Sequence, residues 1–87
     1  MDLRGIFAAN LRRFRHAKGM SQEELADAAD VNRTYISKLE TGVTYAGLEI
    51  IGKLADALDV EPTEFLQPSA RPKTRAAQAT RRAGKSP

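Results

Sequence analysis

The sequence lacks cysteine and tryptophan altogether and contains one histidine among its 87 residues. The absence of cysteine excludes disulfide bonds and thiolate metal sites. A single histidine cannot complete a set of metal ligands or a nucleophile–base–orienter arrangement with the residues around it. We therefore expect no metal, no cofactor, no small-molecule ligand and no enzymatic activity.

Long apolar stretches are missing as well. No run approaches the roughly 20 residues that a helix needs to span a bilayer. Arg12 and Arg13 interrupt the N-terminal region early, so it shows no signal-peptide pattern. We expect a cytoplasmic protein with no membrane partner, and a chain of this length supports one small domain.

Strand-like alternation of apolar and polar residues is absent, whereas apolar residues recur at helical spacing. This predicts an all-α fold, a compact bundle of about five short helices within residues 1–67. The expected helices cover residues 3–17, 22–29, 33–41, 48–58 and 62–66, the last with Pro62 in its first turn. The predicted core-facing residues of the four longer helices are Leu3, Ile6, Phe7, Leu11, Phe14, Leu25, Ala26, Ala29, Ile36, Leu39, Leu48, Ile51, Leu54, Ala55 and Leu58.

Residues 21–42 read as two short helices joined by a tight turn. Ser21 followed by Glu24 matches a capping box at the start of the first helix. Asn32 is a favourable N-cap for the second helix. Asp30 occupies the turn between them, and aspartate tolerates a left-handed backbone better than most residues.

The second of these helices has two chemically distinct faces. Its inward face carries Ile36 and Leu39, three residues apart. Its outward face carries Arg33, Thr34, Ser37 and Lys38. Arginine and lysine donate to guanine edges, and a threonine methyl contacts the thymine methyl, so this face suits the major groove of double-stranded DNA. An ordinary solvated helix face is the alternative.

Several stretches resemble one known family. They are Leu11-Arg12-Arg13-Phe14-Arg15, Lys18-Gly19-Met20-Ser21-Gln22, the run from Ser21 to Gly42, and Leu54-Ala55-Asp56-Ala57-Leu58-Asp59-Val60. Together they are similar to the helix-turn-helix domain of phage repressors and Cro, including bacterial XRE-type regulators, over roughly residues 3–67. The run from Asn32 to Ser37 most resembles small regulators such as restriction–modification controller proteins. The resemblance implies a lambda-repressor-like DNA-binding domain that regulates transcription, with Arg33, Thr34, Ser37 and Lys38 at the base-reading positions.

Six residues are expected to contact DNA phosphates. The resemblance implies this for Gln22, which matches a glutamine that grips a phosphate at a helix N-terminus, where free N–H groups attract anions; an ordinary surface residue is the alternative. Tyr35 contacts a phosphate through its hydroxyl or serves packing alone, and Arg12 and Arg13 lie along the DNA backbone or only keep their helix soluble. The full set of expected phosphate contacts is Gln22, Asn32, Tyr35, Thr44, Tyr45 and Arg12.

Two further features depend on the family pattern. Arg15 and Glu40 match a structural pair that ties the first helix to the end of the third. The loop of residues 43–47 departs from the pattern, because it carries no charge where relatives often have lysine or arginine. The electrostatic contribution of such a loop must then come from the first helix or from the C-terminal tail. We expect the basic residues of the tail to supply the positive charge that the loop lacks.

Acidic residues are missing from that tail, residues 68–87, which holds six of the 14 basic residues. Residues 1–67 therefore carry eight basic and 11 acidic residues. Because large apolar groups are also scarce, we expect the tail to be disordered in isolation. It is either an arm that adds nonspecific affinity by releasing counterions or a solubilising segment without a partner. The tail's basic residues are Arg71, Lys73, Arg75, Arg81, Arg82 and Lys85.

The functional hypothesis is a nucleoid-associated transcriptional regulator, such as a repressor, that binds a pseudo-palindromic operator as a homodimer. One recognition helix reads only a few base pairs, and a two-fold dimer doubles the site. The expected dimer contacts are Val60, Phe65 and Leu66. The alternative is an antitoxin or co-regulator that acts mainly by binding another protein, with the tail as its wrapping segment.

Overall fold

The computed structural model describes residues 1–68, and within them the chain forms helices and no strand. α1 spans Leu3–Ala17, α2 Gln22–Ala29, α3 Arg33–Glu40 and α4 Leu48–Leu58, and a 3-10 helix, η1, spans Pro62–Leu66. The all-α prediction is confirmed, and the predicted bounds hold except that α3 ends one residue earlier. The expected disorder of the tail falls, beyond residue 68, outside the described residues.

The helix starts follow from local hydrogen bonds. Asp2 caps α1, since its Oδ1 accepts from the Gly5 N–H at 3.0 Å. The predicted capping box of α2 is present: the Ser21 hydroxyl accepts from the Glu24 N–H at 3.0 Å, and the Glu24 carboxylate accepts from the Ser21 N–H at 2.8 Å. Asn32 caps α3 by accepting from the Thr34 N–H at 2.7 Å. Each of these contacts lies within three residues of its partner, which is why the sequence predicts it.

The helix ends depend on left-handed residues. Asp30 ends α2 with a φ of 58°, as the sequence predicted for this turn. After α3, Gly42 has a φ of 76°, and the Val43 N–H donates to the Lys38 carbonyl at 3.1 Å. This is the hydrogen bond that commonly closes a helix before a left-handed glycine. It explains why Thr41 caps α3 instead of belonging to it.

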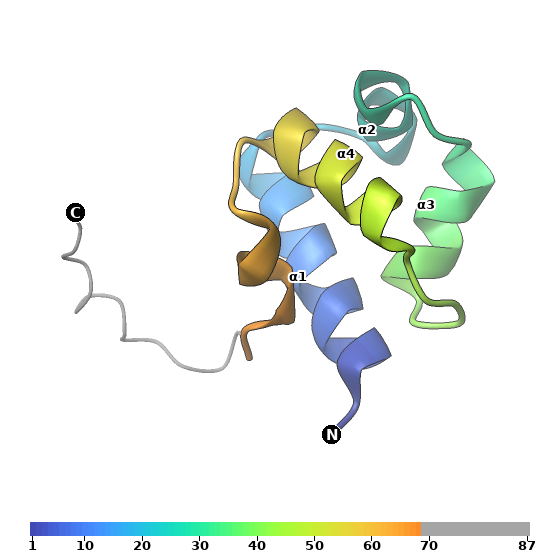
Figure 1. Ribbon diagram of the computed structural model, residues 1–87. Coiled ribbons are helices and arrows are strands. Elements are labelled where there is room, and N and C mark those ends of the chain that lie inside the picture. The colour runs from blue at the N-terminus through green and yellow to red at the C-terminus, as the bar shows by residue number, and fades with distance from the viewer. Residues whose placement is uncertain (69–87) are drawn as a thin grey trace, which may run out of the picture.

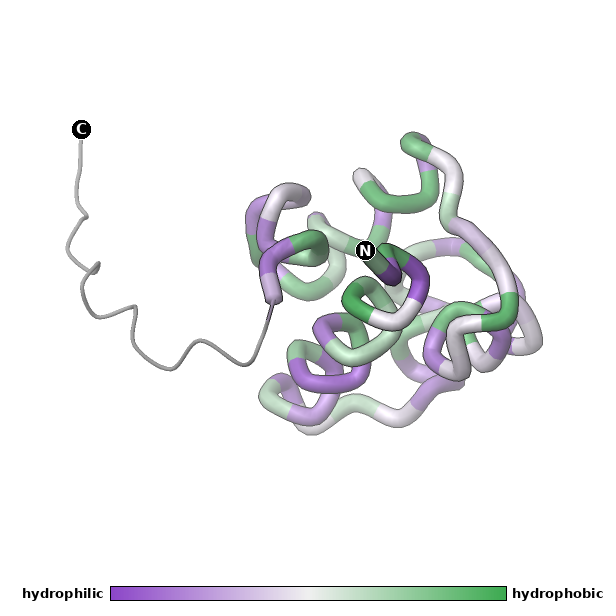
Figure 2. Tube along the Cα trace, turned by 90° about the horizontal axis from the view of Figure 1, so that it is seen from below, coloured by the Kyte–Doolittle hydropathy of each residue, from purple (hydrophilic) through white to green (hydrophobic). Residues whose placement is uncertain are grey.

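The core forms where the helices meet around α1, which lies between α3 and η1 (Figure 1). The ring of Phe65 on η1 lies 5.0 Å from that of Phe7 and 5.6 Å from that of Phe14, measured between ring centroids. Buried aliphatic side chains complete the cluster, and they are Leu11, Leu25, Ile36, Leu39, Leu54 and Leu58. Hydrophobic and hydrophilic residues succeed one another along each helix, as amphipathic helices require (Figure 2). No helix in residues 1–68 is both long and apolar enough to cross a membrane.

Two predicted core residues lie at the surface. Leu3 is 43% exposed and Leu48 is 87% exposed. Both stand in the first turn of their helices, where fewer neighbouring elements cover the side chain. Leu48 also lies about 70° around the helix from the centre of the stripe made by the other apolar residues of α4, at 100° per residue. The prediction for these two residues was wrong.

Candidate nucleic-acid interface

The outer face of α3 comprises Arg33, Thr34, Ser37 and Lys38. Ile36 and Leu39 on the opposite face are fully buried, so the orientation of the helix is set by the core. Arg33, Thr34 and Lys38 are exposed and Ser37 is half-buried. Within residues 1–68, the Arg33 and Lys38 side chains form no ion pair or hydrogen bond. The outer face therefore presents two cations and two hydroxyls that the described part of the chain leaves free.

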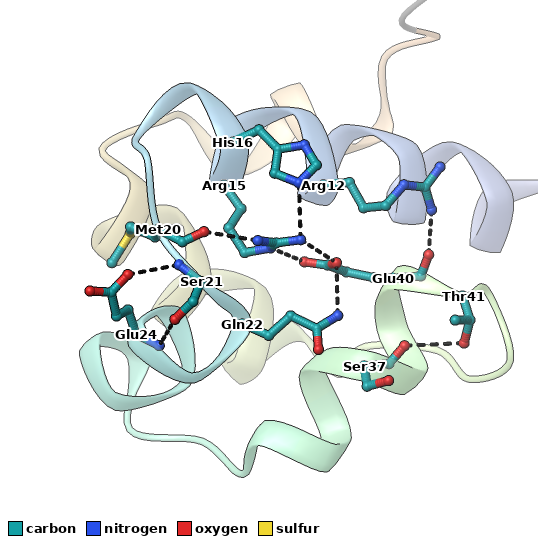
Figure 3. Close-up of polar contacts among 10 residues, drawn as sticks. All are labelled: Arg12, Arg15, His16, Met20, Ser21, Gln22, Glu24, Ser37, Glu40 and Thr41. Atoms are coloured by element: carbon teal, nitrogen blue, oxygen red, sulfur yellow. Dashed lines mark hydrogen bonds and ion pairs between the residues drawn. The ribbon is translucent and has the colours of Figure 1, made fainter.

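Behind this face, the buried carboxylate of Glu40 joins three segments (Figure 3). Arg15 on α1 donates to it from Nε at 2.6 Å and from Nη2 at 3.0 Å. The third guanidinium nitrogen of Arg15, Nη1, donates to the Met20 carbonyl at 2.8 Å. The hydrogen bond that Arg15 donates to Glu40 raises the pKa of Arg15 above its usual value, although burial lowers it and the Coulombic attraction of Glu40 raises it further. The predicted structural pair is present, with Arg15 11% exposed and Glu40 3% exposed.

Two of the expected phosphate contacts are attached to Glu40. The Gln22 amide, at the N-terminus of α2, donates from Nε2 to the Glu40 carboxylate at 3.1 Å (Figure 3). Arg12 donates from one guanidinium nitrogen to the main-chain carbonyl of Glu40. Because a primary amide and a guanidinium carry further N–H groups, both residues retain donors after these bonds. His16 is exposed, and its Nε2 lies 3.2 Å from Nη2 of Arg15.

The other expected phosphate contacts lie near the two ends of α3. Asn32 is exposed at the N-terminal end, although its Oδ1 is used in capping. Tyr35 donates its hydroxyl to the Tyr45 carbonyl at 3.1 Å, which ties α3 to the following loop. Thr44 is half-buried, and Tyr45 is 68% exposed. The loop of residues 43–47 is thus held against α3, with an aromatic ring turned outward.

The expected dimer contacts divide into two groups. Phe65 is fully buried between the phenylalanines of α1, so it belongs to the protomer's own core and cannot be a surface contact in this conformation. The sequence showed an apolar residue near the end of the bundle but not that α1 covers it. Leu66 is 45% exposed and Val60 is half-buried, so these two remain accessible.

Two polar residues that the sequence analysis passed over have specific roles. Asn10 is fully buried, and its amide donates to the carbonyls of Phe65 and Gln67 at 2.7 Å each. Its position in the apolar stripe, three residues after Phe7, was the available signal. Arg4 lies over the ring of Tyr45, 4.8 Å from Cζ to the ring centroid. Nothing local indicates this contact. Among residues 1–68, no cluster of three or more potential metal ligands occurs.

Comparison with known proteins identifies the family. A helix-turn-helix family profile matches residues 11–65. A hypothetical transcription factor from Neisseria meningitidis is 45% identical over 67 residues, which are 77% of this chain and 63% of that protein. The chain thus spans less than two thirds of this relative. Control protein C.BamHI from Bacillus amyloliquefaciens is 41% identical over 75% of this chain and 82% of its own length.

Solved structures give the same result. The crystal structure of the Neisseria transcription factor has a TM-score of 0.73 at 44% identity, over 76% of each chain. The restriction-modification controller protein C.AhdI from Aeromonas hydrophila has a TM-score of 0.69 at 44% identity, over 71% of this chain and 94% of its own. The family and these relatives are DNA-binding transcription regulators and not enzymes. The chain belongs to the XRE-type helix-turn-helix family of DNA-binding transcription regulators.

Proposed function

We propose that this regulator binds a pseudo-palindromic operator as a homodimer, with α3 of each protomer in the major groove. The observation that carries the proposal is the free outer face of α3. The side chains on one face of this eight-residue helix are exposed to solvent, and those on the opposite face are buried in the core. Arg33 and Lys38 are the expected guanine contacts, and Thr34 and Ser37 reach either methyl or polar base edges.

Phosphate contacts then fix α3 in the groove. The second N–H of the Gln22 amide faces the DNA backbone in this proposal, while the first holds Glu40. Arg12 contributes in the same manner from α1, since its bond to the Glu40 carbonyl leaves other donors. Asn32, Tyr35, Thr44 and Tyr45 flank the helix at its two ends. Such contacts set register and affinity without reading sequence.

A second copy of this chain supplies the other half of the operator contacts. We place the dimer contact at Val60 and Leu66, the accessible members of the expected set. Two-fold pairing places two recognition helices about 34–36 Å apart on one side of the duplex. The spacing of two half-sites in the bound DNA is the direct consequence that can be measured.

The test begins with selection of bound sites from random duplex DNA by the full chain, read by sequencing. Two inverted half-sites about 10 base pairs apart, centre to centre, are expected for a two-fold dimer. Binding of variants to the selected site and to a scrambled duplex then separates the two kinds of contact. Arg33→Ala should reduce the preference for the selected site by about 5- to 150-fold, the equivalent of about 1–3 kcal/mol.

Gln22→Ala should weaken binding to the selected and scrambled duplexes by the same factor, because a phosphate contact carries no sequence information. Ala17→Ser, an uncharged change at an exposed position outside every contact assigned above, is the control and should bind as the parent does. Parent-like binding by both Arg33→Ala and Gln22→Ala would show that the assigned surface is wrong. A single half-site in the selected DNA would refute the dimer.

A further inference from the structure

The loop that follows α3 has no positive charge with which to contact DNA phosphates. Residues 43–47 carry no charged side chain. If α3 occupies the major groove, as proposed above, the chain that leaves its C-terminal end passes over the phosphates at the rim of the groove. A surface in that position gains affinity from a cation, because each neutralised phosphate releases counterions. Of the two sources named in the sequence analysis, the first helix and the tail, the first helix belongs to the described residues.

Arg4 is the cation that the fold brings there. It belongs to the first turn of α1, 41 positions before Tyr45 in the sequence, and its Cζ lies 4.8 Å from the centroid of the Tyr45 ring. Both side chains are exposed. The start of α1 and the loop after α3 lie at the same end of the bundle (Figure 1). A guanidinium on an aromatic face is attracted by the ring quadrupole, yet its N–H groups at the edge remain free to bind an anion.

The tyrosine platform is itself held in place. The Tyr45 carbonyl accepts a hydrogen bond from the hydroxyl of Tyr35 on α3 at 3.1 Å. Two contacts therefore connect Arg4 to α3. The Arg4 guanidinium lies on the Tyr45 ring, and the Tyr45 carbonyl accepts from the Tyr35 hydroxyl. A long flexible side chain held in this way loses less conformational entropy when it binds a ligand.

We propose that Arg4 contacts a DNA phosphate beside the C-terminal end of α3, and that the Tyr45 ring positions it. This assignment rests on the proposed docking of α3 and names Arg4 as a further contact of the same surface. Arg4 replaces the charge that the loop lacks. The role of Tyr45 here belongs to its ring and not to its hydroxyl.

The chain offers a matched control in Arg13. This arginine also belongs to α1 and lies over an aromatic ring, 4.5 Å from Cζ to the centroid of Phe14. Its Nη2 donates to Asn10, which in turn holds the carbonyls of η1. Arg13 therefore belongs to the side of α1 that faces η1, across the helix from α3. Arg4 and Arg13 carry the same charge, belong to the same helix and each lie over an aromatic ring. They differ in the face of α1 on which they lie.

The experiment measures the affinity of the full chain for a random-sequence duplex of about 25 base pairs, long enough for two half-sites one turn apart, over a range of salt concentrations. In a plot of log affinity against log salt, Arg4→Ala should make the slope shallower by about 1.8 for a bound dimer, which is about 0.9 for each of its two Arg4 phosphate contacts. Arg13→Ala should leave the slope of the parent. Thermal unfolding of each variant identifies any loss that comes from misfolding.

Changes at Tyr45 test the platform. Tyr45→Phe keeps the ring and should keep the salt slope of the parent, whereas Tyr45→Ala should make the slope shallower. In an Arg4→Ala background, Tyr45→Ala should not change the slope further, because the ring acts on the slope through the arginine. Equal changes of slope in Tyr45→Phe and Tyr45→Ala would assign the effect to the hydroxyl and overturn the proposed role of the ring.

Two results would overturn the assignment of Arg4. One is a parent-like slope in Arg4→Ala while Gln22→Ala weakens binding, which leaves the proposed function intact. The other is a shallower slope only when all six basic residues of the tail are changed to glutamine, which would assign the missing charge to the tail. A lack of effect from Arg4→Ala, Gln22→Ala and Arg33→Ala together would instead refute the proposed docking of α3.

Discussion

Glu40 is the buried residue that joins the elements behind the outer face of α3. Its carboxylate accepts from Arg15 and Gln22, and its carbonyl accepts from Arg12. One buried anion thus orders donors from α1 and from the start of α2 around the end of α3. Removal of one partner leaves an uncompensated buried charge, whereas removal of both does not.

Arg15→Ala should therefore destabilise the fold by about 3–5 kcal/mol, because Glu40 is 3% exposed and keeps only the Gln22 amide. Gln22→Ala leaves the ion pair intact and should cost about 0.5–1.5 kcal/mol. The pair Arg15→Met with Glu40→Leu should recover most of the loss. Urea unfolding measures all three variants, and a cost below about 1 kcal/mol for Arg15→Ala would contradict a stabilising pair. Since the pKa of Arg15 is raised, its titration affects stability only at strongly alkaline pH.

At the scale of the helices, α2 and α4 share an unfavourable ending. Asp30 and Asp59 both occupy left-handed C-cap positions, each with a φ of 58°. Aspartate is tolerated there but glycine is preferred, because a Cβ is strained in this region. A negative charge at a helix C-terminus is also opposed by the helix dipole. Within residues 1–68, neither carboxylate forms a hydrogen bond that would offset the backbone strain and the unfavourable interaction with the helix dipole.

Asp30→Gly should accordingly stabilise the protein by about 0.5–1 kcal/mol, measured as the free energy of urea unfolding. Asp30→Asn should recover the part of this gain that comes from the charge. Asp59→Gly is the matched variant at the end of α4 and should show a similar gain. An Asp30→Gly protein less stable than the parent would mean that the carboxylate makes a favourable contact in solution.

For the whole molecule, the open question is where a second copy binds. Among residues 1–68, several large apolar side chains are exposed, and they include Leu66 at the end of η1 and Leu48 at the start of α4. Our proposal uses Leu66 with the adjacent Val60. Neither change below touches the outer face of α3, so dimerisation can be tested apart from base reading.

Leu66→Glu should raise the dissociation constant of the dimer about tenfold or more, since a carboxylate buried at the interface costs well above the equivalent 1.4 kcal/mol. Sedimentation of the full chain over a concentration series measures this constant. Leu48→Glu, a change at a more exposed leucine, should leave this dissociation constant unaltered. The reverse pattern would move the interface to the start of α4, and a monomeric parent at all concentrations would remove the dimer from the proposal.

The success of the sequence-based predictions follows the range of the interactions involved. The caps at Ser21 and Asn32 and the turn at Asp30 depend on neighbours within a few residues, and all three were predicted. Leu48 and Phe65 were misassigned, the first to the core and the second to a surface. Both errors concern which element covers a side chain. An apolar residue looks the same in a sequence whether a neighbouring helix packs on it or not.

The amino-acid order alone determined the helices, their caps and the polar face of α3, because these depend on periodicity and on hydrogen bonds between near neighbours. Tertiary packing decided the rest. It joined Gln22 to Glu40, closed Asn10 onto the carbonyls of η1 and laid Arg4 on Tyr45. These partners are separated by 18, 55 and 41 positions. Contacts at such separations form only once the core has fixed how the helices cross.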